Sequence, residues 1–204
     1  MRLLYPDALW HMDRSHKTIY LTFDDGPIEG LTPWVLDELD KYGAKATFFC
    51  VGANIRKNKH IYDDILKRGH MVANHSMHHV KGFKTDLQEY VKDVHACEEL
   101  VGGKIFRPPY GQLRRNQYKQ LKEEGYQVVF WDVISYDYEK IKKELVLNNV
   151  LKHTREGSIV LFHDNVKAEK NLTYALPLFL EHFSKLGYSF KILNFNPDRD
   201  RENV

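Results

Sequence analysis

The chain has 204 residues, which is enough for one sizeable hydrophobic core and short for two domains. Apolar residues make up 43% of it, and 30 Lys and Arg against 28 acidic residues leave a formal net charge of only +2. This composition is ordinary for a globular protein and gives no basic stripe, so we expect no nucleic-acid partner. We expect a single domain over residues 1–204, with its core at about 17–193.

The N-terminal residues lack the apolar stretch of a secretory signal, and no run of about 18 apolar residues suggests a membrane segment. As written, the sequence therefore predicts a cytoplasmic protein. An extracellular or cell-envelope location stays open, because a signal or anchor could lie outside this sequence. The two cysteines, Cys50 and Cys97, fall in apolar or helical patterns, so we expect two small core residues and no disulfide framework.

Short β-rich runs alternate with amphipathic runs along the chain. We expect strands at 18–23, 46–51, 70–74, 104–107, 127–133, 158–162 and 188–193. Between them we expect helices at 33–42, 60–68, 85–101, 115–124, 140–155 and 174–186. A glycine, the usual residue at a helix end, follows each of these: Gly43, Gly69, Gly102, Gly125, Gly157 and Gly187. The alternation predicts parallel βαβ units and hence an α/β fold, either a barrel or a doubly wound open sheet.

The chemically capable side chains lie just past the ends of the expected strands. They are Asp24 and Asp25 after the first strand, His75, His78 and His79 after the third, Arg107 and Asp132 at the ends of the fourth and fifth, and His163 and Asp164 after the sixth. In a β/α barrel these ends open onto one face, where active sites are built. The sequence therefore predicts one active site assembled from several loops.

Part of that site has the composition of a metal centre. Two adjacent carboxylates, Asp24 and Asp25, repel each other unless a cation or a proton intervenes. His75 and His79 are four residues apart, a spacing that lets both imidazoles point to one side. Two His and one carboxylate form a common open metal site. We expect His78 to point away; a site that uses His78 in place of His75 is the less favoured alternative.

Two further segments have features of a catalytic site. Arg107-Pro108-Pro109-Tyr110-Gly111 is stiffened by its prolines, so it can hold a backbone N–H in a fixed direction, as an oxyanion hole requires. Leu161-Phe162-His163-Asp164 places a histidine at the end of an apolar strand, where it is positioned for proton transfer near neutral pH.

Together these segments resemble the motifs of the polysaccharide deacetylases, carbohydrate esterase family four. The likeness covers about Lys17 to Leu193 and includes, in the family's order, 22–27, 74–79, 107–111 and 161–164. The resemblance implies a distorted, incomplete β/α barrel with about seven parallel strands. It also implies a metal-dependent hydrolase that removes N-acetyl groups from N-acetylglucosamine-containing carbohydrate.

The resemblance also implies roles for individual residues. Metal ligands would be Asp25, His75 and His79, which hold one divalent ion, most simply zinc, with cobalt or a similar ion as the alternative. Catalytic roles would fall to Asp24 as general base, His163 as general acid, Arg107 as the residue that orients the base, and Tyr110 through its backbone N–H. Substrate contacts would come from Leu161 at the acetyl methyl group and from Pro108 and Trp131.

The fourth family motif, Asp-x-x-Asp after a tryptophan, is incomplete. Aligned on Trp131, Asp137 matches the second Asp, but Ile134 occupies the place of the first, which in the family pairs with the catalytic histidine and raises its pKa. We therefore expect His163 to be a poorer acid, unless Asp132, two residues away on the same face of an extended strand, takes over that contact.

Two alternatives stay open. The substrate could be another acetylated sugar or a small acetylated amide. The chain could also be a carbohydrate-binding homologue with impaired catalysis, for which Ile134 is the support. The native metal, the linkage and length of the substrate and the oligomeric state are left undetermined by the sequence.

Overall fold

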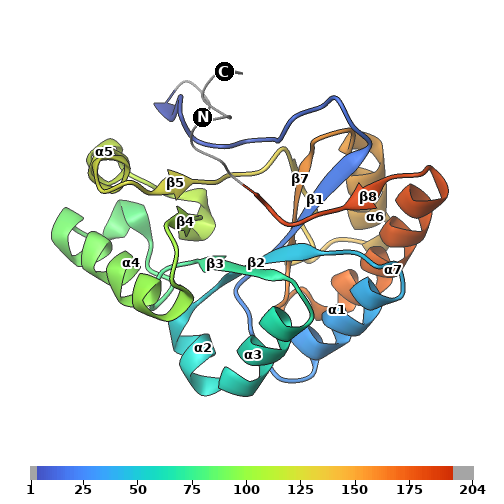
Figure 1. The fold of residues 1–204 in the computed structure, drawn as a ribbon, viewed down its shortest axis with the longest axis horizontal. Helices are drawn as coiled ribbons and strands as arrows, with labels where there is room; N and C mark the ends of the chain where they lie inside the picture. The colour runs from blue at the N-terminus through green and yellow to red at the C-terminus, as the bar shows by residue number, and fades with distance from the viewer. Residues whose placement is uncertain (1–3, 195–204) are drawn as a thin grey trace.

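The computed structural model describes residues 4–194 and forms one curved parallel sheet with helices along several of its sides (Figure 1). The described part has eight strands: β1 Thr18–Asp24, β2 Ala46–Cys50, β3 Met71–Asn74, β4 Ile105–Phe106, β5 Gln127–Val128, β6 Val133–Ile134, β7 Ile159–His163 and β8 Ser189–Phe190. Seven run in the order β5-β4-β3-β2-β1-β7-β6, and β8 pairs with the start of β1. Every strand pair is parallel, and the described strands at the two ends of this order, β5 and β6, do not pair with each other, which confirms the expected incomplete barrel. The ends of the expected domain, 1–3 and 195–204, lie outside the described residues.

The prediction of one strand at 127–133 is wrong. The segment forms two short strands, β5 and β6, at opposite ends of the strand order. Between them the chain crosses from one edge to the other, because the Val129 N–H bonds to Phe106 in β4 while the Asp132 N–H bonds to Ile159 in β7. The N-terminal segment spans the same gap, since Leu9 pairs with Val129 and His11 pairs with Ser158. The barrel is therefore incomplete at this side.

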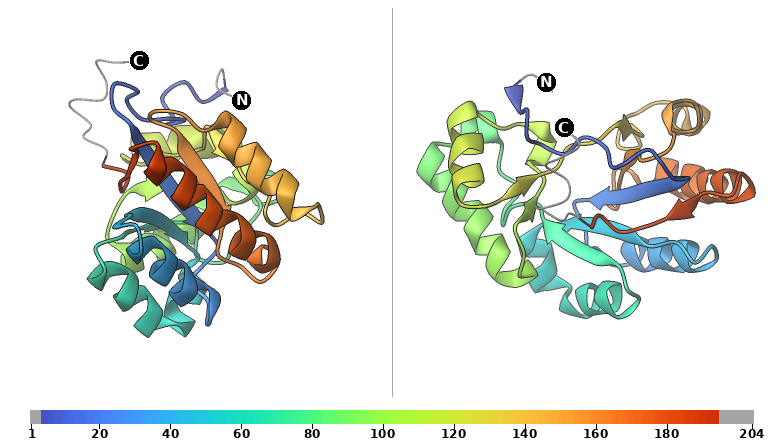
Figure 2. Two further views of the ribbon diagram at one scale, coloured as in Figure 1. Left: turned by 90° about the vertical axis from the view of Figure 1, so that its right-hand side faces the viewer. Right: turned by 45° about the horizontal axis from the view of Figure 1, so that its top comes forward.

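Seven α-helices of the described chain lie around the outside of the sheet (Figure 2). They are α1 Leu31–Asp40, α2 Gly52–Lys57, α3 Lys59–Lys67, α4 Leu87–Val101, α5 Arg115–Glu123, α6 Lys143–His153 and α7 Glu169–Lys185. The sequence did not indicate α2, which is only six residues long. It also placed the start of α7 too late, because the helix continues through Pro177 from an earlier first turn. None of these helices is long and apolar enough to cross a membrane.

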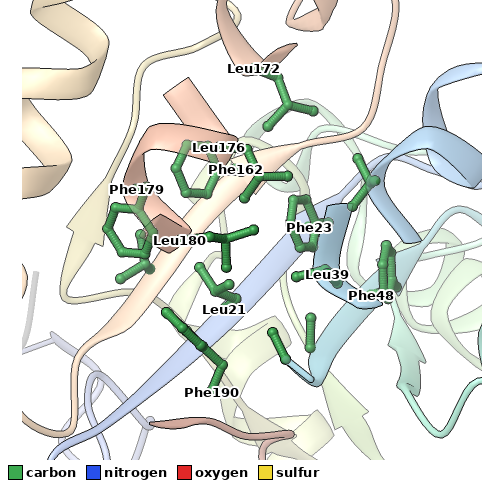
Figure 3. Close-up of a cluster of buried hydrophobic side chains, with 14 of the residues drawn as sticks. Leu21, Phe23, Leu39, Phe48, Phe162, Leu172, Leu176, Phe179, Leu180 and Phe190 are labelled. Atoms are coloured by element: carbon green, nitrogen blue, oxygen red, sulfur yellow. The ribbon is translucent and has the colours of Figure 1, made fainter. Parts of the chain in front are cut away.

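The largest core cluster lies between the central strands and helices α1 and α7 (Figure 3). Phe23 and Phe48 stack across β1 and β2 with ring centroids 5.0 Å apart, and Phe162 of β7 meets Phe179 of α7 edge-on at 5.8 Å. All four rings are fully buried, which is worth about 1.5–3 kcal/mol for each side chain. This packing fixes β1 and β7, whose carboxyl ends carry Asp24 and His163.

The cysteines are buried and free, as expected. Cys97 of α4 lies next to the end of β2, where its Sγ donates to the carbonyl of Cys50 at 3.6 Å. Burial raises the pKa of the Cys97 thiol to about 12, so this thiol is neutral and belongs to the packing between helix and sheet.

Candidate active site

A cavity of about 650 Å³ lies at the carboxyl ends of the strands. It brings together eight of the ten residues singled out in the sequence: Asp24, Asp25, His75, His79, Tyr110, Trp131, Leu161 and His163. Arg107 is fully buried, and Pro108 is buried too. Ile134, Tyr138, Asn165 and Lys167 also line the cavity. The site is therefore assembled from loops far apart in sequence.

Asp25, His75 and His79 form a group that could hold a metal ion, with ligand atoms all within 4.8 Å of one another. Oδ1 of Asp25 lies 2.9 Å from Nε2 of His79 and 3.5 Å from Nε2 of His75. A tetrahedral zinc ion with ligands at 2.0–2.1 Å requires ligand atoms roughly 3.3 Å apart. The spacing of these three atoms therefore fits a single divalent ion.

The backbone conformations of Asp25 and His79 and the hydrogen bond at Nδ1 of His75 support this arrangement. Asp25 has φ of 85° and His79 has φ of 55°, left-handed conformations that aim both side chains into the cavity. Nδ1 of His75 lies 2.8 Å from the carbonyl oxygen of Arg107. Because a carbonyl only accepts, Nδ1 carries the proton, and Nε2 is left with the lone pair that a metal ligand needs.

His78 points away from this group. Its Nδ1 lies 2.6 Å from Oδ1 of Asp93 in α4, and its backbone N–H donates to Oδ2 of the same carboxylate at 3.0 Å. The His78 side chain is 65% exposed, whereas His75 is buried. Through these two contacts with His78, Asp93 fixes the loop that contains His75 and His79 against α4. The alternative metal site with His78 in place of His75 is wrong.

Asp24 is held by a buried arginine. Nη1 of Arg107 donates to Oδ1 of Asp24 at 2.7 Å and to the hydroxyl of Thr22 at 2.8 Å, while Nη2 donates to the Phe130 carbonyl. The guanidinium lies 4.0 Å from the centroid of the Phe49 ring. Burial lowers the pKa of Arg107, but the charge and hydrogen bond of Asp24 oppose this, so Arg107 remains a cation in its buried site.

His163 has a carboxylate partner, and the expectation that it lacks one is wrong. Its Nδ1 lies 2.8 Å from Oδ1 of Asp137, and its backbone N–H donates to Oδ2 of Asp137 at 2.8 Å. Burial would lower the pKa of His163, but the charge and hydrogen bond of Asp137, with smaller contributions from Asp24 and Asp25, raise it to about 9. His163 is therefore protonated at neutral pH, as a general acid must be.

Asp132 does not take over this contact. Its Oδ2 accepts from Nη2 of Arg14 at 2.9 Å and from the hydroxyl of Ser158 at 2.8 Å. Ser158 directly precedes β7, so Asp132 lies at the amino ends of the strands. The expectation that Asp132 joins the carboxyl-end cluster is wrong, because the chain breaks between β5 and β6 and the assumed strand alternation does not continue.

The remaining predicted residues form the wall of the cavity. Tyr110 has φ of 59° in a tight turn, and its ring packs 4.5 Å from that of His79. The Trp131 ring lies against Gly111, where an added Cβ would come within 2.9 Å of it. Leu161 is buried at the cavity wall, and Tyr138 contacts His163 edge-on at 4.8 Å.

The two residues that follow His163, Asp164 and Asn165, were not assigned a role from the sequence. Asp164 accepts from the Gly26 N–H at 3.1 Å and from the Thr32 hydroxyl at 2.6 Å. Burial raises the pKa of Asp164 to about 8. Asn165 donates to Oδ2 of Asp25 at 2.6 Å. Only their position next to His163 in the sequence could have indicated them.

Comparison with known proteins agrees with this geometry. The family model for polysaccharide deacetylase matches residues 11–129. A peptidoglycan-N-acetylglucosamine deacetylase of Bacillus cereus is 34% identical over 193 residues, which covers 89% of this chain and 88% of that protein. A peptidoglycan-N-acetylmuramic acid deacetylase of Bacillus subtilis is 30% identical over 198 residues, which covers 92% of this chain and 74% of that protein.

The fold agrees as well. A crystal structure of a peptidoglycan N-acetylglucosamine deacetylase, in complex with a naphthalenyl N-oxidanyl-benzamide, superposes with a TM-score of 0.86 at 30% identity and covers 92% of this chain and 91% of the other. Because the family match spans more than half of the sequence and the related proteins align over nearly all of it, this chain belongs to the polysaccharide deacetylases, carbohydrate esterase family four.

Proposed function

We propose that this protein is a metal-dependent hydrolase that removes N-acetyl groups from N-acetylglucosamine units in the glycan strands of peptidoglycan. One cavity holds a group suited to a divalent cation, a carboxylate beside it and a protonated histidine, and this combination supports the proposal most strongly. The names of the related Bacillus proteins support peptidoglycan as the polymer, and the name of the one with the higher identity, 34% against 30%, supports N-acetylglucosamine as the sugar.

The metal ligands in this proposal are Asp25, His75 and His79. A mixed nitrogen and oxygen donor set with three protein ligands favours zinc, with cobalt as the alternative. When bound, the ion would supply Lewis-acid polarisation of the acetyl carbonyl and a lower pKa for water.

Asp24 would act as the general base. Its Oδ1 is fixed by Arg107, and its Oδ2 faces the metal group, 3.8 Å from Nε2 of His75. A carboxylate held in this way can accept the proton of an attacking water without rotating. The backbone N–H of Tyr110 would stabilise the oxyanion that forms on the acetyl oxygen.

His163 would act as the general acid. The leaving amine needs a proton when the carbon–nitrogen bond breaks, and His163 holds one on Nε2 while Nδ1 faces Asp137. Leu161 and Trp131 would form the wall that receives the acetyl methyl group and the sugar ring, whereas Pro108, expected to contact substrate, is buried outside the cavity lining. The products are acetate and a free amino sugar.

Peptidoglycan lies outside the cytoplasmic membrane. A protein that acts on it works in the envelope or outside the cell, so we propose an envelope or extracellular location.

Acetate release tests the function. Metal-stripped protein would be incubated with N-acetylglucosamine oligomers and with purified peptidoglycan, before and after zinc or cobalt is added, with Asp24→Asn as the matched control. We expect release only with metal and only from the wild-type protein. Stoichiometric zinc binding without release from any of these substrates would contradict the proposal and favour another acetylated substrate or a carbohydrate-binding role.

A further inference from the structure

The two carboxylate oxygens of Asp25 have different neighbours. Oδ1 faces Nε2 of both His75 and His79. Oδ2 accepts from the side-chain amide of Asn165 at 2.6 Å. Asn165 therefore lies on the far side of the carboxylate from the two imidazoles, although it is 140 residues away in the sequence.

The orientation of the Asn165 amide is fixed by its own oxygen. Oδ1 of Asn165 accepts from the backbone N–H of Lys167 at 2.8 Å and from that of Ala168 at 3.0 Å, in the turn that leads into α7. Because backbone N–H groups only donate, the amide oxygen must face the turn, and the NH₂ group must face Asp25. Ala168 is fully buried in the main core, so the turn itself is anchored.

The backbone of Asp25 is fixed separately. Nδ2 of Asn54 donates to its carbonyl at 2.7 Å, and its N–H donates to the carbonyl of Phe49 at 3.2 Å. The next residue, Gly26, is held by Asp164. With the backbone set, rotation of the carboxylate is the freedom that remains, and the hydrogen bond from Asn165 restricts it.

We propose that Asn165 is a positioning residue that holds the Asp25 carboxylate with Oδ1 toward His75 and His79 and thereby sets the affinity of the site for a divalent cation. The proposal rests on the proposed function, because it requires Asp25 to be a metal ligand. Hydrogen-bond partners of metal ligands typically change metal affinity 10- to 100-fold when they are removed.

The test is the zinc affinity of Asn165→Ala, measured with the full chain by competition against a chromophoric chelator, without substrate. We expect the zinc Kd to rise about 10- to 100-fold. Asn165→Ser is the second variant, because serine keeps an oxygen for the turn before α7 but is too short to reach Asp25. We expect a similar rise in Kd with a smaller change in Tm.

Asp86→Ala is the matched control. Asp86 caps α4 by accepting from the Glu89 N–H at 3.0 Å, and it is absent from the residues that line the cavity. It should lower Tm and leave the zinc Kd unchanged. A zinc Kd for Asn165→Ala within about twofold of wild type, or an equal rise in Asp86→Ala, would overturn the proposal. Wild-type protein that binds no zinc would overturn the metal site itself, whereas zinc binding without acetate release would contradict only the proposed function.

Discussion

Replacing Asp137 by asparagine is expected to weaken His163 as an acid. The pKa of His163 is raised from 6.5 to about 9, with Asp137 as the main raising influence. Asparagine keeps the size of the side chain and one acceptor oxygen but removes the negative charge. Burial, which lowers the pKa of His163, would then act with little opposition, so we expect the pKa in Asp137→Asn to fall to 6.5 or below.

The size of the effect follows from these two values. Their difference corresponds to about 3 kcal/mol in favour of the protonated ring. At pH 7.5 the protonated fraction of His163 would fall roughly tenfold, whereas at pH 5.5 it would change little. A bound cation would oppose the smaller raising contributions of Asp24 and Asp25 to the His163 pKa, whereas the contribution of Asp137 comes from a direct contact.

The assay is the pH dependence of kcat/KM for acetate release, whose alkaline limb reports the acid of the free enzyme. We expect this limb to move to lower pH in Asp137→Asn, with the rate recovering toward pH 5.5. Asp132→Asn is the control, because Asp132 contacts Arg14 and Ser158 instead of His163. An alkaline limb that stays in place in Asp137→Asn, or moves equally in both variants, would refute the reasoning.

Four further outcomes follow from the same contacts. Asp24→Asn should keep zinc but lose turnover by about 10²- to 10⁴-fold, and normal turnover would exclude Asp24 as the base. His79→Ala should bind zinc at least tenfold more weakly; unchanged zinc stoichiometry at low metal concentration would remove it from the ligand set. Ile134→Asp should not raise kcat/KM, since Asp137 already bonds to His163; a clear gain would show that the Asp137 contact is insufficient. Burial lowers the pKa of His70 to about 4, so the unfolded chain takes up a proton first and stability falls as pH drops from 6.5 toward 4. The free energy of unfolding, measured in urea at pH 7 and at pH 5, should therefore fall by about 2 kcal/mol more in wild type than in His70→Gln. Equal decreases in the two proteins would contradict this.

Most of the fold could be predicted because the residues that end its helices can be recognised locally in the sequence. The six glycines expected to follow helices all have positive φ, the conformation that ends a helix and that glycine adopts most readily. Parallel strands place their carboxyl ends together, so knowing which residues follow which strand was sufficient to predict that Asp25, His75 and His163 converge.

The break between β5 and β6 could not be predicted in the same way. Residues 127–133 are largely apolar because both faces of this segment are covered, and such a run has no periodicity that marks an interruption. The break decides where two side chains point. Asp132 turns toward Arg14 at the amino ends, and Trp131 lies against Gly111 at the cavity.

The pairing of Asp137 with His163 shows why spacing along a motif is a poor guide to a contact. After Ile134 the chain leaves β6, with the Ser135 N–H still bonded to Leu161, and Tyr136 adopts φ of 61°. This reversal brings Asp137 back to the end of β7, where both of its oxygens meet His163. A carboxylate three residues later in sequence therefore makes the contact expected of position 134. Because Asp137 supplies this carboxylate contact, the isoleucine at 134 does not leave His163 without a partner.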